Sequence, residues 1–157
     1  MSKDAAGQQI APPPSADQSR ARHVVIVGFG LSGRSTVNNV IEQNVSYAVI
    51  ETNEETVDRC TKGGLNIIFG DARDPEILKQ AGIERATDVA ITVPNDEITL
   101  AVVEQVRRLK DSARIIARAT FVSDGLEATQ RGADETVVAE KVVATEFGRV
   151  ILAALQR

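Results

Sequence analysis

Three glycines near the start of the chain fit the pattern G-x-G-x-x-G, in the stretch Gly28-Phe29-Gly30-Leu31-Ser32-Gly33. The stretch directly follows the apolar run 24–27 and opens a segment with helical spacing, which is the context that a phosphate-binding turn requires. In such a turn Gly28 permits the tight bend, Gly30 leaves space for a phosphate, and Gly33 lets the helix pack closely on the strand. The free N–H groups at the helix start would then face an anion.

A carboxylate follows the second apolar run, because residues 48–50 lead directly into Glu51, 18 residues after Gly33. This is close to the position of the acid that accepts both ribose hydroxyls of a bound nucleotide. Glu51 would repel a 2′-phosphate, and Thr52 brings no compensating positive charge, so NAD or an adenine nucleotide is favoured over NADP. The alternative is a glycine turn that only tightens a strand–helix junction, with Glu51 a solvated carboxylate.

A third polar turn follows the apolar run 65–69 and reads Gly70-Asp71-Ala72-Arg73-Asp74-Pro75. In a dinucleotide-binding fold this turn passes beside the adenosine, so Asp71 or its backbone is predicted to contact the adenine edge. Arg73 is predicted to reach a phosphate. On sequence alone, Asp71 is an equally good candidate to cap the next helix.

These residues need a scaffold of strands and helices, and the chain alternates between the two patterns from His23 onward. Six continuous runs rich in β-branched residues predict strands buried on both faces: 24–27, 48–50, 65–69, 89–91, 115–117 and 136–138. Segments with helical spacing lie between them. We therefore predict an α/β, Rossmann-like, doubly wound six-stranded parallel sheet in the order 3-2-1-4-5-6, with helices on both faces.

Composition excludes several classes of protein. The 157 residues carry 18 basic and 22 acidic side chains, which gives a formal charge of −4 and argues against nucleic-acid binding. A single Cys and a single His exclude a disulfide framework and a zinc site, and His23 is interpreted as a strand-edge residue. No segment is apolar enough to insert into a membrane, so we expect a cytoplasmic protein. Residues 1–22 are predicted to be a disordered tail or linker, and 23–157 the folded domain.

Several segments together resemble the N-terminal lobe of RCK domains, also called KTN or TrkA-N domains. They are 25–33, 49–51, 70–76, 81–83, 116–119 and 132–134, and the turn 70–76 followed by 81–83 is the most specific of them. Such domains sense nucleotides in potassium channels, potassium-uptake systems and glutathione-gated Kef-type efflux antiporters. The resemblance implies that NAD(H), AMP, ADP or ATP is bound and not consumed, and that the domain forms dimers or larger rings.

The resemblance also implies roles for individual residues. Gly28, Gly30 and Gly33 would receive phosphate, Glu51 the ribose, and Asp71 with Ala72 the adenine. Arg118, at the end of the fifth predicted strand, would reach a phosphate, although an ion pair with a neighbouring helix is nearly as well supported. The full set of predicted binding residues adds Phe29, Leu31, Ser32, Thr52, Arg73, Thr92 and Val93. No catalytic residue and no metal ligand are predicted.

The sequence departs from the family pattern in three places. Leu31 replaces an Arg that contacts phosphates in many members, so a triphosphate is expected to bind less well. Thr99 replaces the usual Asn after the fourth strand. The chain ends without the C-terminal lobe of many members, so it is expected to be either an excised cytoplasmic domain of an inner-membrane protein or a separate small subunit.

The last segment, residues 142–155, is too apolar for a helix that exposes one polar face to solvent. It is expected to be buried by a partner or by the chain's own sheet. In the resembling domains the corresponding helix crosses to a second subunit, so a homodimer is predicted.

Two enzyme classes remain as alternatives. An NAD-dependent oxidoreductase fragment would need a substrate pocket and an acid/base group, but Tyr47 has Glu51 four residues later where a Lys would be required. A methyltransferase would need an extra antiparallel strand that the pattern lacks. Cys60 is interpreted as a small buried residue in preference to a redox thiol. A regulatory binding module, not an enzyme, is therefore the favoured function.

Overall fold

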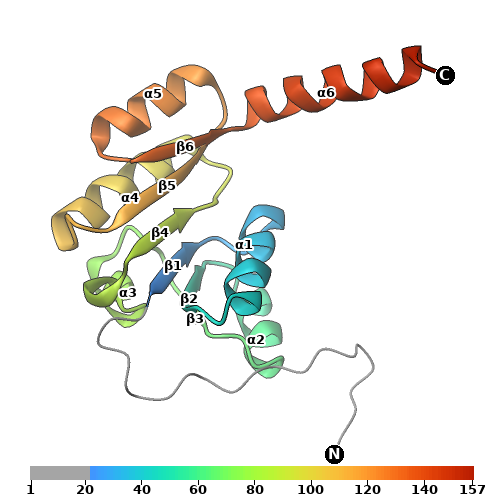
Figure 1. Cartoon of the computed structure of the whole chain (residues 1–157). Helices are drawn as coiled ribbons and strands as arrows, with labels where there is room; N and C mark the ends of the chain where they lie inside the picture. Colours follow the sequence, from blue (N-terminus) through green and yellow to red (C-terminus); the bar gives the residue numbers. More distant parts are fainter. Residues whose placement is uncertain (1–21) are drawn as a thin grey trace, which may run out of the picture.

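Six strands form one parallel sheet in the order β3-β2-β1-β4-β5-β6 in the computed structural model, which describes residues 22–157. This confirms the predicted fold class and strand order (Figure 1). The strands are β1 His23–Val27, β2 Ser46–Glu51, β3 Ile67–Phe69, β4 Asp88–Ile91, β5 Arg114–Ala119 and β6 Glu135–Val138.

The strands are connected by crossovers that contain helices, as parallel pairing demands. The helices are α1 Leu31–Glu42, α2 Glu54–Lys62, α3 Pro75–Gln80, the 3-10 turn η1 Ile83–Arg85, α4 Asp96–Leu109, α5 Val122–Arg131 and α6 Ala139–Leu155. The strand order reverses between β1 and β4, so the turns after these two strands meet at one edge of the sheet.

Alternate residues of the strands face two separate hydrophobic clusters, as the period of two in a strand requires. Val25 and Val27 of β1 belong to the larger cluster, which α3, α4 and α5 cover. Val24 and Ile26 belong to the smaller cluster on the other face, beneath α1 and α2, which also buries Cys60. The burial of Cys60 agrees with its interpretation as a core residue.

His23 begins β1 and is only 1% exposed, so it is a buried strand-end residue. Its Nε2 lies 2.8 Å from the carbonyl oxygen of Ala81, which accepts, so Nε2 carries the proton and Nδ1 accepts from the hydroxyl of Ser46 at 2.9 Å. Burial lowers the pKa of His23, the hydrogen bond to Ala81 opposes this, and the positive charge of Arg85 lowers it further. The residue holds two strands and a turn together.

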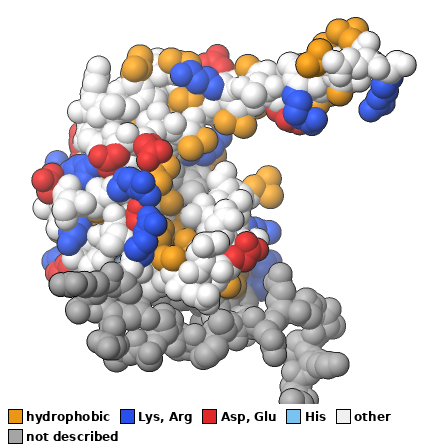
Figure 2. Space-filling view, viewed as in Figure 1, with side chains coloured by type: hydrophobic (Ala, Val, Ile, Leu, Met, Phe, Trp, Pro, Cys, Tyr) orange, Lys and Arg blue, Asp and Glu red, His pale blue; other side chains and the backbone are white. Residues whose placement is uncertain are grey.

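Helix α6 extends away from the sheet (Figure 1), and none of its residues is buried within the described part of the chain. Its large apolar side chains are between 50% and 79% exposed: Val142, Val143, Phe147, Val150, Ile151, Leu152 and Leu155. Apolar side chains are visible along the projecting helix in the space-filling view (Figure 2). The chain's own sheet therefore does not cover α6, which leaves a partner as the expected cover.

The predicted disordered tail lies outside the described residues except for Arg22. The guanidinium of Arg22 donates to Asp88 at 3.0 Å, at the beginning of β4. Between residues 22 and 157, no helix has the length and apolar character needed to cross a membrane.

Candidate nucleotide-binding site

The glycine turn between β1 and α1 is held by contacts from both neighbouring strands. Gly28 adopts φ +95°, a conformation that favours glycine, and its N–H donates to the carbonyl of Ile50 at 2.9 Å. From the other side, the hydroxyl of Thr92 lies 2.9 Å from the carbonyl oxygen of Val27 and 3.2 Å from that of Gly28. The turn is therefore fixed by a residue within β2 and by the residue that follows β4.

The other two glycines of the motif occupy different environments. A Cβ atom at Gly33 would lie 2.1 Å from the carbonyl oxygen of Gly28, so α1 can approach the strand only with glycine at this position. A Cβ at Gly30 would meet no atom of residues 22–157 within 4 Å. The space at Gly30 is open, as the approach of a phosphate requires.

The N-terminus of α1 lacks the caps that several other helices have. Asn53, Asp74 and Asn95 cap α2, α3 and α4 through side-chain oxygens. In contrast, within the described residues Gly30 gives α1 no side-chain cap, and no acidic residue lies in its first turn. The first N–H groups of α1 therefore face the open space beside Gly30, where an anion would be stabilised.

Glu51 ends β2 beside this turn and binds backbone groups on both sides. Its Oε2 accepts from the N–H of Phe29 at 2.9 Å, and its Oε1 accepts from the N–H of Asn53 at 2.9 Å and lies 3.4 Å from the hydroxyl of Thr52. A carboxylate has about four lone-pair sites, so Oε2 can still accept from one ribose hydroxyl, and Oε1 from a second if the Thr52 hydroxyl turns away. These hydrogen bonds of Glu51 to the glycine turn were not predicted from the sequence, because the spacing of residues alone does not indicate them.

The turn after β3 lies at the same edge of the sheet, since Phe69 pairs with Glu51 and the N–H of Gly70 donates to the carbonyl of Glu51 at 3.0 Å. Asp71 does not cap α3, because Asp74 does so. The Asp71 carboxylate instead binds the side chain and N–H of Arg73, with Nη2 at 2.6 Å from Oδ2, and these hydrogen bonds lower the pKa of Asp71.

The remaining predicted residues differ in exposure. Ala72 is 4% exposed and its side chain packs in the core, so only its backbone can contact an adenine. Leu31 is 89% exposed at the first position of α1. Val93 lies against the glycine turn, since a Cβ at Gly28 would be 2.9 Å from its Cγ1. Thr99, the departure on α4, is buried and its hydroxyl donates to the carbonyl of Asn95 at 2.9 Å.

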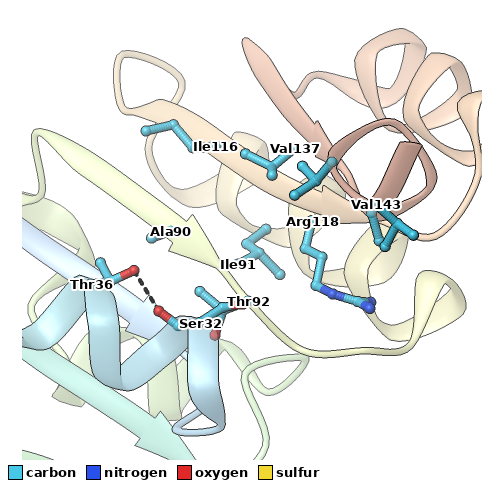
Figure 3. Close-up of a pocket in the computed structure, with 11 residues that line it drawn as sticks. Ser32, Thr36, Ala90, Ile91, Thr92, Ile116, Arg118, Val137 and Val143 are labelled. Atoms are coloured by element: carbon cyan, nitrogen blue, oxygen red, sulfur yellow. Dashed lines mark hydrogen bonds between the residues drawn. The ribbon is translucent and has the colours of Figure 1, made fainter. Parts of the chain in front are cut away.

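Arg118 lies in a pocket of about 290 Å³ beside the glycine turn (Figure 3). The pocket shares Ser32 and Thr92 with that turn and is otherwise mostly apolar, with Thr36, Ala90, Ile91, Ile116, Val137, Ala139, Val142 and Val143 as its other lining residues. The structure thus groups the glycine turn, Glu51, Thr92 and Val93 closely, with Asp71 to Arg73 along the same edge and Arg118 in the adjacent pocket. No sequence signal could have outlined this pocket, because three strands and two helices contribute to it.

Comparison with known proteins agrees with this geometry. The family model described as the TrkA-N domain matches residues 24–139. The chain belongs to the TrkA-N domain family. This confirms the resemblance found in the sequence.

Two transport proteins are among the relatives of this TrkA-N domain. The putative cation/proton antiporter YbaL of Escherichia coli (strain K12) is 30% identical over 122 residues, which cover 78% of this chain and 22% of YbaL. The glutathione-regulated potassium-efflux system protein KefC of Klebsiella pneumoniae (strain 342) is 26% identical over 155 residues, 99% of this chain and 25% of KefC. The chain thus spans about a quarter of the length of these relatives.

Solved structures show the same fold. The crystal structure of the TrkA-N domain of the inner membrane protein YbaL from Escherichia coli superposes with a TM-score of 0.78 at 27% identity, covering 84% of this chain and 98% of that one. The crystal structure of GsuK bound to ADP superposes with a TM-score of 0.71 at 26% identity, covering 82% of this chain and 33% of that one. The second comparison shows that a structure of this similarity has been solved with bound ADP.

Proposed function

We propose that this TrkA-N domain is a nucleotide-sensing regulatory domain of a potassium transport system. The observation that carries the proposal is the uncapped N-terminus of α1, which opens at Gly30 directly beside the carboxylate of Glu51. The ADP-bound relative GsuK and the potassium-efflux relative KefC support the choice of ligand class and of system. The ligand is NAD(H) or an adenine nucleotide such as AMP, ADP or ATP.

In the proposed complex the phosphates lie at the N–H groups of α1, beside Gly30, Leu31 and Ser32, where the helix dipole favours negative charge. The ribose hydroxyls donate to the free lone pairs of Glu51, close to Thr52. The adenine lies along the turn after β3, beside Asp71 and the backbone of Ala72. Arg73 can reach a phosphate only if it releases Asp71, to which it is bound in the free protein.

The proposed domain binds its nucleotide without consuming it. Its one histidine is buried and both ring nitrogens are engaged, and its one cysteine is buried, so neither is a free acid, base or nucleophile. Among residues 22–157 no group of three or more His, Cys, Asp or Glu side chains is placed to hold a metal ion. These observations favour regulation over the alternative of an oxidoreductase fragment.

The proposed assembly is a homodimer, or a larger ring of such dimers, attached to a membrane channel or antiporter on its cytoplasmic side. Helix α6 exposes a long apolar surface, and the pocket beside Arg118 is apolar and open. A second copy would cover both, because α6 of each protomer would pack on the body of the other. Nucleotide binding then alters transport only through a difference in affinity between two states of the dimer.

Isothermal calorimetry with the purified chain tests the proposal. We expect ADP, AMP and NADH to bind with one site per chain, and NADPH to bind at least about tenfold more weakly because Glu51 repels its 2′-phosphate. Chromatography of the nucleotide after incubation should return it unchanged. Turnover of NADH with a carbonyl substrate would instead favour the oxidoreductase, and the absence of binding by every adenine nucleotide would refute both functions.

A further inference from the structure

The pocket beside the glycine turn contains a guanidinium with one buried nitrogen that no group of residues 22–157 binds. Arg118 is the only charged residue among the described residues that line it, and its Nη1 is buried without a hydrogen-bond partner within residues 22–157. The surrounding side chains are mainly aliphatic, so they cannot replace the hydrogen bonds that water gave to this group. A buried guanidinium N–H without an acceptor is unfavourable, which means that the pocket is incomplete in the single protomer.

The exposed helix α6 carries an acidic residue in the middle of an apolar face. Glu146 lies one helical turn after Val142 and Val143 and one turn before Val150, and residues at these spacings share one face. Those three valines are 50% to 58% exposed. A carboxylate at the centre of such a face needs a positive partner wherever the face becomes buried.

In the protomer Glu146 has only a surface partner. Its carboxylate binds Arg149 at 2.6 and 2.8 Å, three residues along the helix, and both side chains are more than half exposed. Exposed ion pairs of this kind contribute little. Arg149 lies three residues after Glu146 and so borders the same face, whereas Lys141 and Thr145, spaced four residues apart, form a polar strip beside that face.

We propose that Glu146 of the second copy enters the pocket and accepts a hydrogen bond from the buried Nη1 of Arg118. The two groups are complementary in charge, and each lies in an apolar surface that would otherwise bury it unpaired. The pair forms twice in a dimer with two-fold symmetry, once in each pocket. Each nucleotide site is then completed by the other protomer, because the pocket shares Ser32 and Thr92 with the glycine turn.

The pairing is assigned between protomers because α6 projects away from the sheet in its own chain (Figure 1). Within the described protomer Glu146 binds Arg149, and the buried Nη1 of Arg118 has no partner, although Val142 and Val143 at the start of the same helix line the pocket. The inference rests on the proposed homodimer and adds to it the residue that each copy supplies to the other.

Charge reversal in the full chain tests the pair. We expect Arg118→Glu and Glu146→Lys each to raise the dimer dissociation constant by at least about 100-fold, measured by sedimentation equilibrium. The double variant should return to within roughly tenfold of the wild type, since the pair is restored with reversed charges. Lys141→Glu is the matched control, because it reverses a charge on the polar strip of the same helix, and it should change the constant by less than about threefold.

Mixing the two single variants distinguishes pairing between protomers from pairing within one. Equal amounts of Arg118→Glu and Glu146→Lys should form a heterodimer, since both of its pockets then contain opposite charges, although each variant alone is monomeric. Failure to form the heterodimer, or a double variant as weak as the two single effects combined, would overturn the proposal.

Three further outcomes distinguish failure of the Arg118–Glu146 pair from failure of the proposed dimer or of the proposed nucleotide site. A wild-type chain that is folded but monomeric at tens of micromolar would overturn the dimer and the pair together. A wild-type dimer in which the reversals leave association unchanged would overturn the pair alone. If Arg118→Glu also weakens ADP binding and the double variant does not restore it, Arg118 serves the phosphate and the pair is again refuted.

Discussion

At the scale of single residues, two glycines of one motif have different physical roles. Gly33 is required by the protein itself, since a side chain there would meet the carbonyl of Gly28, whereas Gly30 faces open space. Glu51 combines both kinds of role, because it holds the backbone of Phe29 and Oε2 can still accept a hydrogen bond. Gly33 is therefore needed for folding, Gly30 is proposed to receive the ligand, and Glu51 lies between these two roles.

The two glycines predict opposite effects on stability. Gly33→Ala should lower the free energy of unfolding by about 3 kcal/mol, because the added Cβ overlaps backbone that cannot move freely. Gly30→Ser should leave it unchanged or raise it by up to about 1 kcal/mol, since serine caps a helix well and has space here. Urea denaturation of both variants checks this, and equal destabilisation by the two would contradict the assigned roles.

His23 should titrate below its ordinary pKa of 6.5, since burial disfavours the charged ring. The stability that it contributes is present in full above pH 6.5 and is lost as pH falls below this value towards the folded-state pKa. The chain has one histidine, so its ring proton resonance in NMR needs no assignment by mutation. A titration midpoint at or above 6.5 in the folded protein would contradict the buried hydrogen-bonded arrangement.

At the scale of elements, β4 has a polar contact at each end, a charged one from Asp88 and a neutral one from Thr92. Asp88 at its beginning is 6% exposed and binds both Arg22 and Arg114, and Thr92 just after its end holds the glycine turn. Burial acts to raise the pKa of Asp88, but hydrogen bonds from Arg22, Thr87 and Arg114 outweigh it and lower the pKa. Strand β4 therefore connects Arg22, the first described residue, with the candidate site.

Asp88→Asn should lower the free energy of unfolding at pH 7 by about 1.5–3 kcal/mol, because two charged hydrogen bonds lose their ionised acceptor. The stability from this carboxylate is present above its ordinary pKa of 3.8 and is lost as pH falls through the lower folded-state pKa. The difference in unfolding free energy between the variant and the wild type should therefore become smaller in that range. Thermal unfolding across pH 2.5–7, a range set by these values, measures both effects.

Glu127→Gln is the control for this prediction. Glu127 binds Arg131 at 2.7 Å on the exposed face of α5, and its loss should cost less than about 1 kcal/mol. Equal losses of unfolding free energy in the two variants would mean that the buried ion pairs of Asp88 stabilise the fold no more than an exposed pair does.

The strands and helices could be predicted from the sequence more completely than the partners of individual side chains. Runs such as 24–27 are continuous and β-branched, which strands buried on both faces require, so the parallel sheet followed from the pattern, and its order from that expected of a dinucleotide-binding fold. The partner of Asp71 did not follow, because Asp71 and Asp74 are both good caps and only the geometry selects Asp74. Nor could spacing place Arg118 beside Ser32 and Val143, since that pocket joins residues far apart in the chain.

At the scale of the whole molecule, the proposed dimer depends on the exposed apolar surface of α6. Val143→Asp combined with Val150→Asp should leave the unfolding free energy of a protomer within about 1 kcal/mol of the wild type, since neither side chain is buried in it. The same change should abolish the dimer, because it places charges in the buried face. Light scattering at tens of micromolar measures this, and Thr145→Asp on the polar strip is the matched control. A dimer that survives the double substitution would exclude α6 as the interface.

The central claim is that the glycine turn binds an adenine nucleotide, and the most direct measurement is calorimetric titration of ADP into the wild type and Gly30→Asp. The substitution has space in the free protein but places a carboxylate where the phosphate would lie, so the fold should persist. We predict saturable binding to the wild type and at least about tenfold weaker binding to the variant. Equal affinity of two folded proteins, or no binding to the wild type, would contradict the account.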